Sequence, residues 1–177
     1  MSLNTLNDIL TKNNLLYHWS KYENTESILK KGILSINLLK KKQMPVYAPD
    51  IVQEMYGTDM ISVISLIGEK NPHEIFLEKK LQCIYERPPE HRVWHIFRDD
   101  IIYVIEPTIK TIPLGWYPYE HLVKNVIDRE DILLVCCNKV LIDKRFEEKS
   151  DLVIDEIYKI CKKFQKKVIT CDISPYL

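Results

Sequence analysis

One histidine of this sequence stands where a predicted strand gives way to a predicted helix. The apolar run over residues 15–19 predicts a short strand, and His18 falls near its end. A helix over residues 24–31 is expected next, because a polar N-cap residue opens it and Gly32 stops it. An imidazole placed there can donate a hydrogen bond from one nitrogen while a neighbour fixes the other. The pattern fits a ligand-binding histidine with Ser20 beside it, and equally a structural histidine.

A second histidine pattern bears on metal binding. His91 and His95 have the spacing that puts two imidazoles on one face of a helix, where they can share a metal ion. The apolar residues between and after them favour a strand, in which positions four apart lie about 13 Å from each other. A metal hydrolase is therefore the weaker alternative, and no metal site is expected. The sequence also lacks a glycine-rich phosphate loop and the nucleophile elbow of α/β hydrolases.

Several strands are predicted between residues 60 and 137. Continuous apolar runs predict buried strands over residues 60–67, 101–105 and 132–137. Residues 92–97 form a candidate hairpin with the second of these, through a turn at residues 99–100. These strands make the middle of the chain rich in β structure.

The second half of the chain reads as loop, strand and helix. Residues 113–118 contain two prolines and predict a loop, while residues 121–123 and 168–171 predict short strands. A helix that begins at Ser150 or Asp151 has the most regular amphipathic pattern in the sequence. Its apolar stripe comprises Ile154, Ile157, Tyr158, Cys161 and Phe164.

Composition bounds the broad class. The 177 residues, 46% of them apolar, suffice for one packed domain, and residues 1–177 are taken as a single globular domain. Basic and acidic residues number 25 each, so the net charge provides no general attraction to nucleic acid. No apolar stretch reaches the ~20 residues of a membrane span, which predicts a soluble cytoplasmic protein. The five cysteines form no C-x-x-C pair and are expected to be buried free thiols.

Two blocks of the sequence resemble the ADP-ribosyltransferase fold, including its DarT-like, diphtheria-toxin-like and tRNA 2'-phosphotransferase branches. The first block, residues 16–35, combines the strand, His18 and the capped helix. The second block, residues 119–132, has Glu120 at the start of a short strand and ends where another strand opens with an acidic residue and isoleucine. The resemblance implies an α+β fold in which two small β-sheets form a cleft for NAD and helices flank them.

The resemblance also assigns roles to single residues. Glu120 occupies the position of the catalytic glutamate, whose carboxylate stabilises the positive charge that develops on the ribose as nicotinamide leaves. His18 would hold the adenosine ribose, and Ser20 would add a hydroxyl. Ser62 falls on the serine-bearing strand that supports the nicotinamide pocket, together with Ser65. No motif matches the ring that stacks on nicotinamide; Tyr56 is the candidate for it, with Tyr47 and Tyr103 as alternatives.

The implied activity is transfer of ADP-ribose from NAD, the substrate, to a macromolecular acceptor. The acceptor is a protein or a nucleic acid, and the neutral net charge favours a protein or a small RNA over duplex DNA. In a toxin, a cognate inhibitor protein would be a further partner. Two other functions stay open. One is a noncatalytic interaction protein on a related α+β scaffold, of viral or mobile-element origin, and the other is an RNA enzyme similar to 2'-phosphotransferases.

Overall fold

The computed structural model describes residues 15–46, 57–65, 99–114 and 117–171. The sequence-based predictions that lie outside these residues are the strand over residues 92–97, His91, His95, Cys83, Tyr47 and Tyr56.

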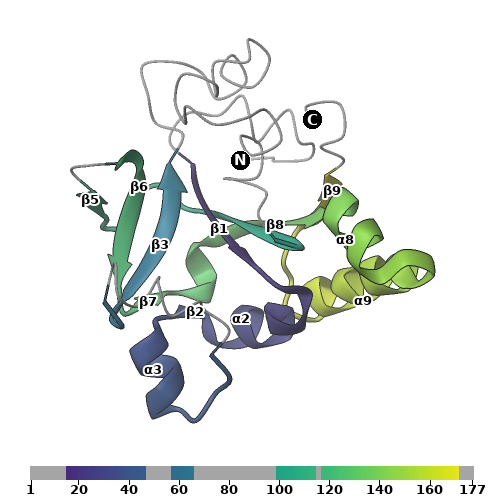
Figure 1. Ribbon diagram of the computed structural model, residues 1–177, viewed down its shortest axis with the longest axis horizontal. Coiled ribbons are helices and arrows are strands. Elements are labelled where there is room, and N and C mark those ends of the chain that lie inside the picture. The colour runs from purple at the N-terminus through teal and green to yellow at the C-terminus, as the bar shows by residue number, and fades with distance from the viewer. Residues whose placement is uncertain (1–14, 47–56, 66–98, 115–116, 172–177) are drawn as a thin grey trace.

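A seven-stranded sheet forms the centre of the described structure (Figure 1). Neighbouring strands are antiparallel except for the pair β8 and β9, which is parallel. A separate two-stranded antiparallel ribbon pairs β2 (Ile33–Leu34) with β7 (Val126–Ile127). The spatial order of the large sheet is β5 (Ile112–Leu114), β6 (Tyr117–Lys124), β3 (Met60–Ser65), β1 (Leu16–Ser20), β4 (Ile101–Ile105), β8 (Ile132–Asn138) and β9 (Val168–Cys171).

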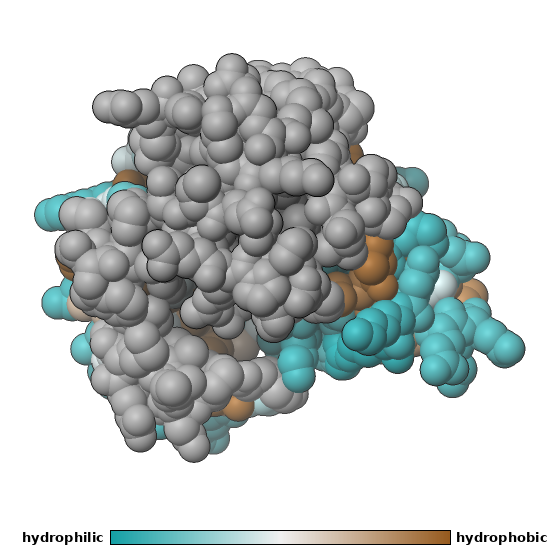
Figure 2. All heavy atoms as spheres, turned by 45° about the horizontal axis from the view of Figure 1, so that its top comes forward, coloured by the Kyte–Doolittle hydropathy of each residue, from teal (hydrophilic) through white to brown (hydrophobic). Residues whose placement is uncertain are grey.

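Helices connect the strands and cover the sheet. A parallel pair needs a crossover connection, and α8 and α9 supply it between β8 and β9. The surface around these two helices is largely hydrophilic on the side shown in Figure 2. None of the helices in the described part of the chain has the length and apolar character of a membrane span. The helical elements are η1 (Tyr22–Asn24), α2 (Thr25–Lys31), α3 (Ile36–Lys41), η3 (Arg129–Asp131), α8 (Lys139–Phe146), η4 (Glu147–Lys149) and α9 (Ser150–Lys163).

The main core lies between the sheet and helices α2 and α9. Leu16, Tyr103 and Val135 come from three adjacent strands and are buried. They belong to the same cluster as Leu29 of α2 and Ile157 of α9, both of which are 0% exposed. Full burial of such a side chain contributes about 1.5–3 kcal/mol relative to its exposure. This packing holds the sheet and both helices together.

The structure confirms the α+β class and most of the buried strands. The strands predicted over residues 60–67, 101–105 and 132–137 correspond to β3, β4 and β8. The predicted loop over residues 113–118 is wrong, because β5 ends at Leu114 and β6 already begins at Tyr117. The loop prediction failed because prolines are tolerated at the first residues and edges of sheets, and β5 is an edge strand.

Two further predictions are corrected. Glu120 does not open a short strand but is the fourth residue of the eight-residue strand β6. On α9, Tyr158 was expected in the apolar stripe, yet it is 39% exposed, and Val153 is buried instead. The buried stripe is therefore centred on the side of the helix that carries Val153, Ile157 and Cys161.

The cysteines are only partly as expected. Cys137 and Cys161 are buried free thiols, and burial raises the pKa of Cys161 to about 12. Cys136 and Cys171 instead form a disulfide between β8 and β9, with their Cα atoms 6.1 Å apart. The parallel register places Cys171 opposite Asn138, diagonally across from Cys136. Spacing along the sequence could not reveal this neighbourhood.

Gly32 joins α2 to the β2–β7 ribbon at very close range. Its N–H donates to the carbonyl of Ile28 at 2.8 Å, which ends the helix as predicted. Its φ is +83°, and a Cβ atom at this position would collide with the carbonyl oxygen of Ile127. Gly57 has a similar φ of +81°, but no atom of the described residues lies within 4 Å of its hypothetical Cβ. A comparison of alanine substitutions at the two glycines therefore distinguishes the effect of steric collision from that of backbone strain.

We expect Gly32→Ala to lower the free energy of unfolding by about 3 kcal/mol, because it adds a collision with backbone to the strain of a positive φ. Gly57→Ala carries the strain alone and should cost about 1–2 kcal/mol. Urea denaturation of both variants measures the difference. Equal losses would contradict the close packing of α2 against the ribbon.

Candidate functional site

The strand that carries His18 is paired unequally on its two sides. β1 pairs with β4 along its whole length, from Leu16 opposite Ile105 to Ser20 opposite Ile101. With β3 it pairs at only two positions, the last of which joins Tyr17 to Ile64. The ladder between β1 and β3 therefore stops just before His18, and the backbone beyond it has no ladder on that side.

The imidazole of His18 bridges this gap. Its Nδ1 lies 2.9 Å from the carbonyl oxygen of Ser62 on β3. Because a carbonyl only accepts hydrogen bonds, the hydrogen must be on Nδ1. Burial lowers the pKa of His18, and the bond to Ser62 opposes this only partly, so the ring is neutral near pH 7. The Nε2 atom is left as an acceptor with no hydrogen-bond partner among the residues described.

A second polar contact lies where β1 ends. The side-chain amide of Asn24 donates to the hydroxyl of Ser20 at 2.8 Å. Asn24 was expected to cap the following helix with its side chain, and this is wrong, because it makes no capping hydrogen bond. A short 3₁₀ turn precedes the helix, and the hydroxyl of Thr25 donates to the carbonyl of Tyr22 at 2.7 Å. The hydroxyl of Ser20 is thus held against the start of α2.

The predicted catalytic residue lies two strands from His18. Glu120 is on β6 and lies opposite Ile64 of β3. Ser62 of β3 lies opposite Leu122, two residues after Glu120 on β6. The spatial order β6, β3, β1 therefore brings the backbone positions of Glu120, Ser62 and His18 onto three consecutive strands. The sequence alone gave no indication of this order.

His121, beside Glu120, was not considered from the sequence as part of the site. Its Nδ1 lies 3.4 Å from the hydroxyl of Thr111, and burial lowers the pKa of His121. It lies opposite Val63 of β3. A second neutral imidazole thus accompanies the predicted catalytic position.

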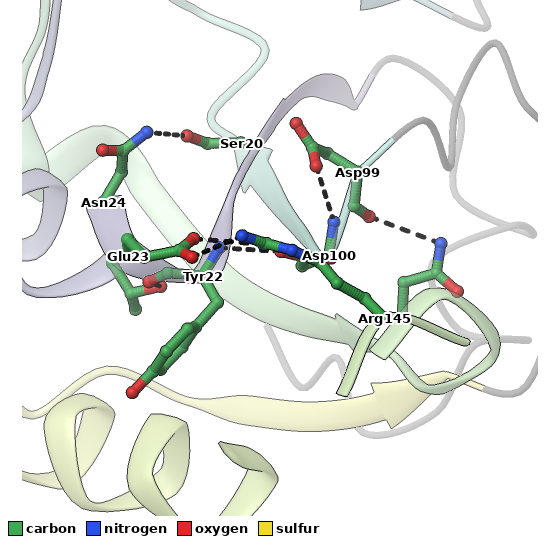
Figure 3. Close-up of polar contacts among 9 residues, drawn as sticks. Ser20, Tyr22, Glu23, Asn24, Asp99, Asp100 and Arg145 are labelled. Carbon is green, nitrogen blue, oxygen red and sulfur yellow. Dashed lines mark hydrogen bonds and ion pairs between the residues drawn. The ribbon is translucent and has the colours of Figure 1, made fainter. Parts of the chain in front are cut away.

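An ion-pair cluster built around the buried carboxylate of Asp100 lies next to the end of β1 (Figure 3). The carboxylate of Asp100, 3% exposed, accepts from the backbone N–H of Tyr22 at 3.1 Å and from the guanidinium of Arg145. Arg145 also pairs with both carboxylate oxygens of Glu23. Burial opposes ionisation of Glu23, but Arg145 outweighs it and lowers the pKa of that carboxyl. Burial, reinforced by the charge of Asp100, raises the pKa of Asp99.

This cluster links three elements that are distant in sequence: the turn after β1, the start of β4 and the end of α8. From the sequence, residues 99–100 predicted only a turn. An Asp-Asp pair immediately before a buried strand was the one available signal, because a carboxylate there needs a cation. The distance in sequence between Asp100 and Arg145 hid which cation it was.

Three further features bear on a ligand site: Tyr103, the hollows of the described structure and the groups that could hold a metal ion. Tyr103 is fully buried, which rules it out as the ring that stacks on a ligand. Two hollows of the described structure are lined by residues of η3, α9 and β9 and of the turn between the last two, and not by His18, Ser20 or Ser62. The residues described contain no group of three His, Cys, Asp or Glu side chains suited to a metal ion.

Comparison of the chain with protein-family models and with curated proteins found no match.

We expect acidification to weaken the fold through His18. The pKa of His18 is lower in the folded than in the unfolded protein, so the unfolded chain takes up the proton first as pH falls below about 6.5. Stability present above that pH is then lost, at no more than about 1.4 kcal/mol per pH unit for this one group. Denaturant unfolding at about pH 7.5 and 5.5 measures the loss.

His18→Asn provides the comparison, because its amide can still donate to Ser62 but does not titrate. The variant should lose less stability than the wild type over this pH interval. His121 contributes in the same direction in both proteins and cancels from the difference. An identical pH dependence would show that the His18 pKa is not lowered.

Removal of the Arg145 guanidinium should destabilise the protein strongly. Arg145→Met leaves the Asp100 carboxylate buried without its cation, at a cost of about 3–5 kcal/mol. Arg129→Gln breaks a solvent-exposed pair with Glu130 and should cost less than about 1 kcal/mol. Adding Asp100→Asn to Arg145→Met should restore part of the loss, since the amide carries no charge. Thermal and urea unfolding test the series, and similar effects of Arg145→Met and Arg129→Gln would refute the buried pair.

Proposed function

We propose that this protein is an NAD-dependent ADP-ribosyltransferase that transfers ADP-ribose to a macromolecular acceptor. The observation that supports the proposal most is the strand order β6, β3, β1, because it places Glu120, Ser62 and His18 on consecutive strands, with Glu120 and Ser62 on one face of the sheet and His18 on the other. These residues lie in separate blocks of the sequence. On this proposal, NAD lies in a cleft between two sheets and helices flank it.

The proposed role of His18 is to bind the adenosine ribose. The bond from Nδ1 to Ser62 fixes the orientation and tautomer of the ring, so that Nε2 can accept a hydrogen bond from a ribose hydroxyl. Ser20, held by Asn24, is proposed to add a hydroxyl to the same part of the substrate. Ser62 and Tyr56 are proposed for the nicotinamide end. Each of these groups binds and orients the substrate without taking part in bond breaking.

Glu120 is proposed as the catalytic residue. The bond between nicotinamide and ribose breaks with its electron pair going to nicotinamide, and the positive charge that develops on the ribose is stabilised by the carboxylate. The acceptor's nucleophilic atom then forms the new bond to the ribose and gives its proton to the carboxylate. Neutral His18 adds no positive charge that would oppose this step.

The acceptor is proposed to be a protein or a nucleic acid, and the zero net charge fits a protein or a small RNA better than duplex DNA. If the enzyme serves as a toxin, a cognate inhibitor protein is a second partner. In the absence of an acceptor, water can take the same place, so nicotinamide release reports on the proposed site without knowledge of the acceptor.

A second candidate function is a noncatalytic interaction protein on the same scaffold. The observation that favours it is the register of the sheet, which places the positions of Glu120 and Ser62 on the face opposite to His18. On this alternative, the strands carrying these residues keep a structural role and NAD does not bind. The two candidates make opposite predictions for a single titration.

The test is calorimetric titration of NAD into the wild type and three variants, with nicotinamide release measured in the same mixtures. His18→Asn keeps the donor to Ser62 but lacks Nε2, so NAD should bind about tenfold more weakly while the fold is retained. Glu120→Gln should bind NAD and lose release by about 100-fold or more. Glu148→Gln, an exposed carboxylate on η4, is the matched control and should behave as the wild type.

Absence of NAD binding at millimolar concentration would refute the transferase and favour the interaction protein. Binding that is unaffected by His18→Asn would refute the assigned ribose contact. Release that survives Glu120→Gln would show that another group acts on the glycosidic bond.

A further inference from the structure

Two hollows meet at one lysine near the end of α9, away from the proposed NAD site. One, of about 350 Å³, lies between η3 and the turn that ends α9, and the other, of about 530 Å³, lies between α9 and β9. Lys166 lines both. The first is lined by Arg129, Glu130, Lys163, Phe164, Gln165 and Lys166.

The ammonium group of Lys166 is only partly satisfied. Its Nζ donates to the backbone carbonyl of Ile132 at 2.8 Å, which uses one of three N–H groups. The side chain is half-buried, and burial lowers its pKa, with Glu130 and Arg129 acting in opposite directions. A partly desolvated cation whose one described bond goes to a neutral oxygen gains most from an anion.

The other cations around Lys166 have donors to spare. Arg129 bonds Glu130 through Nε at 2.6 Å, and its two terminal amino groups have no partner among the described residues. Lys159 and Lys162 make no ion pair within the described part of the chain. Together the two hollows are lined by five cations and two carboxylates. Cations therefore outnumber carboxylates in the lining of each hollow.

The helix dipole explains only part of this charge. Lysines in the last turn of a helix complement its negative C-terminal end, which accounts for Lys162 and Lys163. Arg129 belongs to η3, and Lys166 follows the left-handed residue Gln165, which has a φ of +56°. These two cations come from outside the helix and converge on the same hollow.

We propose that the hollow between η3 and the end of α9 binds a phosphate group. The guanidinium fork of Arg129 and the ammonium of Lys166 are the two kinds of donor that proteins use for phosphate oxygens. Phe164 lines the same hollow and supplies an apolar wall for whatever the phosphate is attached to. The second hollow, lined by Tyr158, Lys159 and Lys162 among others, extends the site along α9. The phosphate is carried either by a small phosphate ester or by a nucleic-acid strand. This inference does not rest on the proposed transferase activity.

Amide chemical-shift titrations with inorganic phosphate test the proposal. We expect saturable shifts at residues 129 and 163–166. Lys166→Met should weaken binding by about tenfold or more, and Arg129→Gln by about fivefold. Arg129→Gln changes an exposed side chain and keeps the site testable if Lys166→Met fails to fold. Lys149→Met, an exposed lysine on η4, removes the same charge elsewhere and should change affinity by less than about twofold.

Two further ligands distinguish the sources of phosphate. Adenosine monophosphate that binds at least as well as phosphate, with no gain for a single-stranded oligonucleotide of about twelve residues, supports a small ester. An oligonucleotide that binds at least tenfold more tightly, with affinity falling as salt rises, supports a strand. Either result upholds the site, and Arg129→Gln should weaken the binding of both ligands.

Absence of saturable shifts up to about 20 mM phosphate, a concentration at which even weak sites fill, would overturn the proposal. So would equal weakening by Lys149→Met and Lys166→Met, since binding would then reflect total charge alone. Shifts confined to other parts of the protein would place the anion elsewhere and overturn it as well.

Discussion

The hydrogen bond from His18 to the backbone of Ser62 is the interaction on which the rest of the site depends. β1 is fully paired with β4, but its ladder with β3 stops at Tyr17. From that point the imidazole, not the backbone, joins the two strands. The His18 side chain thus extends the short backbone ladder that joins the part of the sheet carrying Glu120 to β1 and β4. The same bond decides which nitrogen of His18 remains for a ligand.

The polar cluster around Asp100 supports this junction from the turn that follows β1. By accepting from the N–H of Tyr22, the buried carboxylate fixes the turn that follows Ser20, and Arg145 offsets its charge. This turn leads into α2, whose Leu29 packs into the core. The ion pair of Asp100 with Arg145 therefore positions the turn after β1, and this turn positions both the start of α2 and the end of β1. Positions within the site are therefore held by packing and charge pairing well outside it.

Sequence reasoning succeeded where the signal was local. The apolar runs of β4 and β8 and the stop at Gly32 are visible in a few consecutive residues, because burial on both faces and a positive φ leave direct traces in residue type. It failed where the answer depends on pairing at long range. The strands β5 and β6 around two prolines, the disulfide of Cys136 with Cys171 and the order of the strands all follow from the assembled sheet. His18 and Glu120 could be proposed from the sequence, whereas their placement two strands apart could not.

The tautomer of His18 tests the account most directly. Long-range proton–nitrogen correlation spectra of protein labelled with ¹⁵N-histidine, with His18→Asn used for assignment, report on both ring nitrogens. The account predicts a neutral ring at pH 7 with the hydrogen on Nδ1, and an Nε2 signal that moves when NAD is added. A ring that carries its hydrogen on Nε2, or one that is doubly protonated at this pH, would contradict the junction between β1 and β3 and the ligand contact that depends on it.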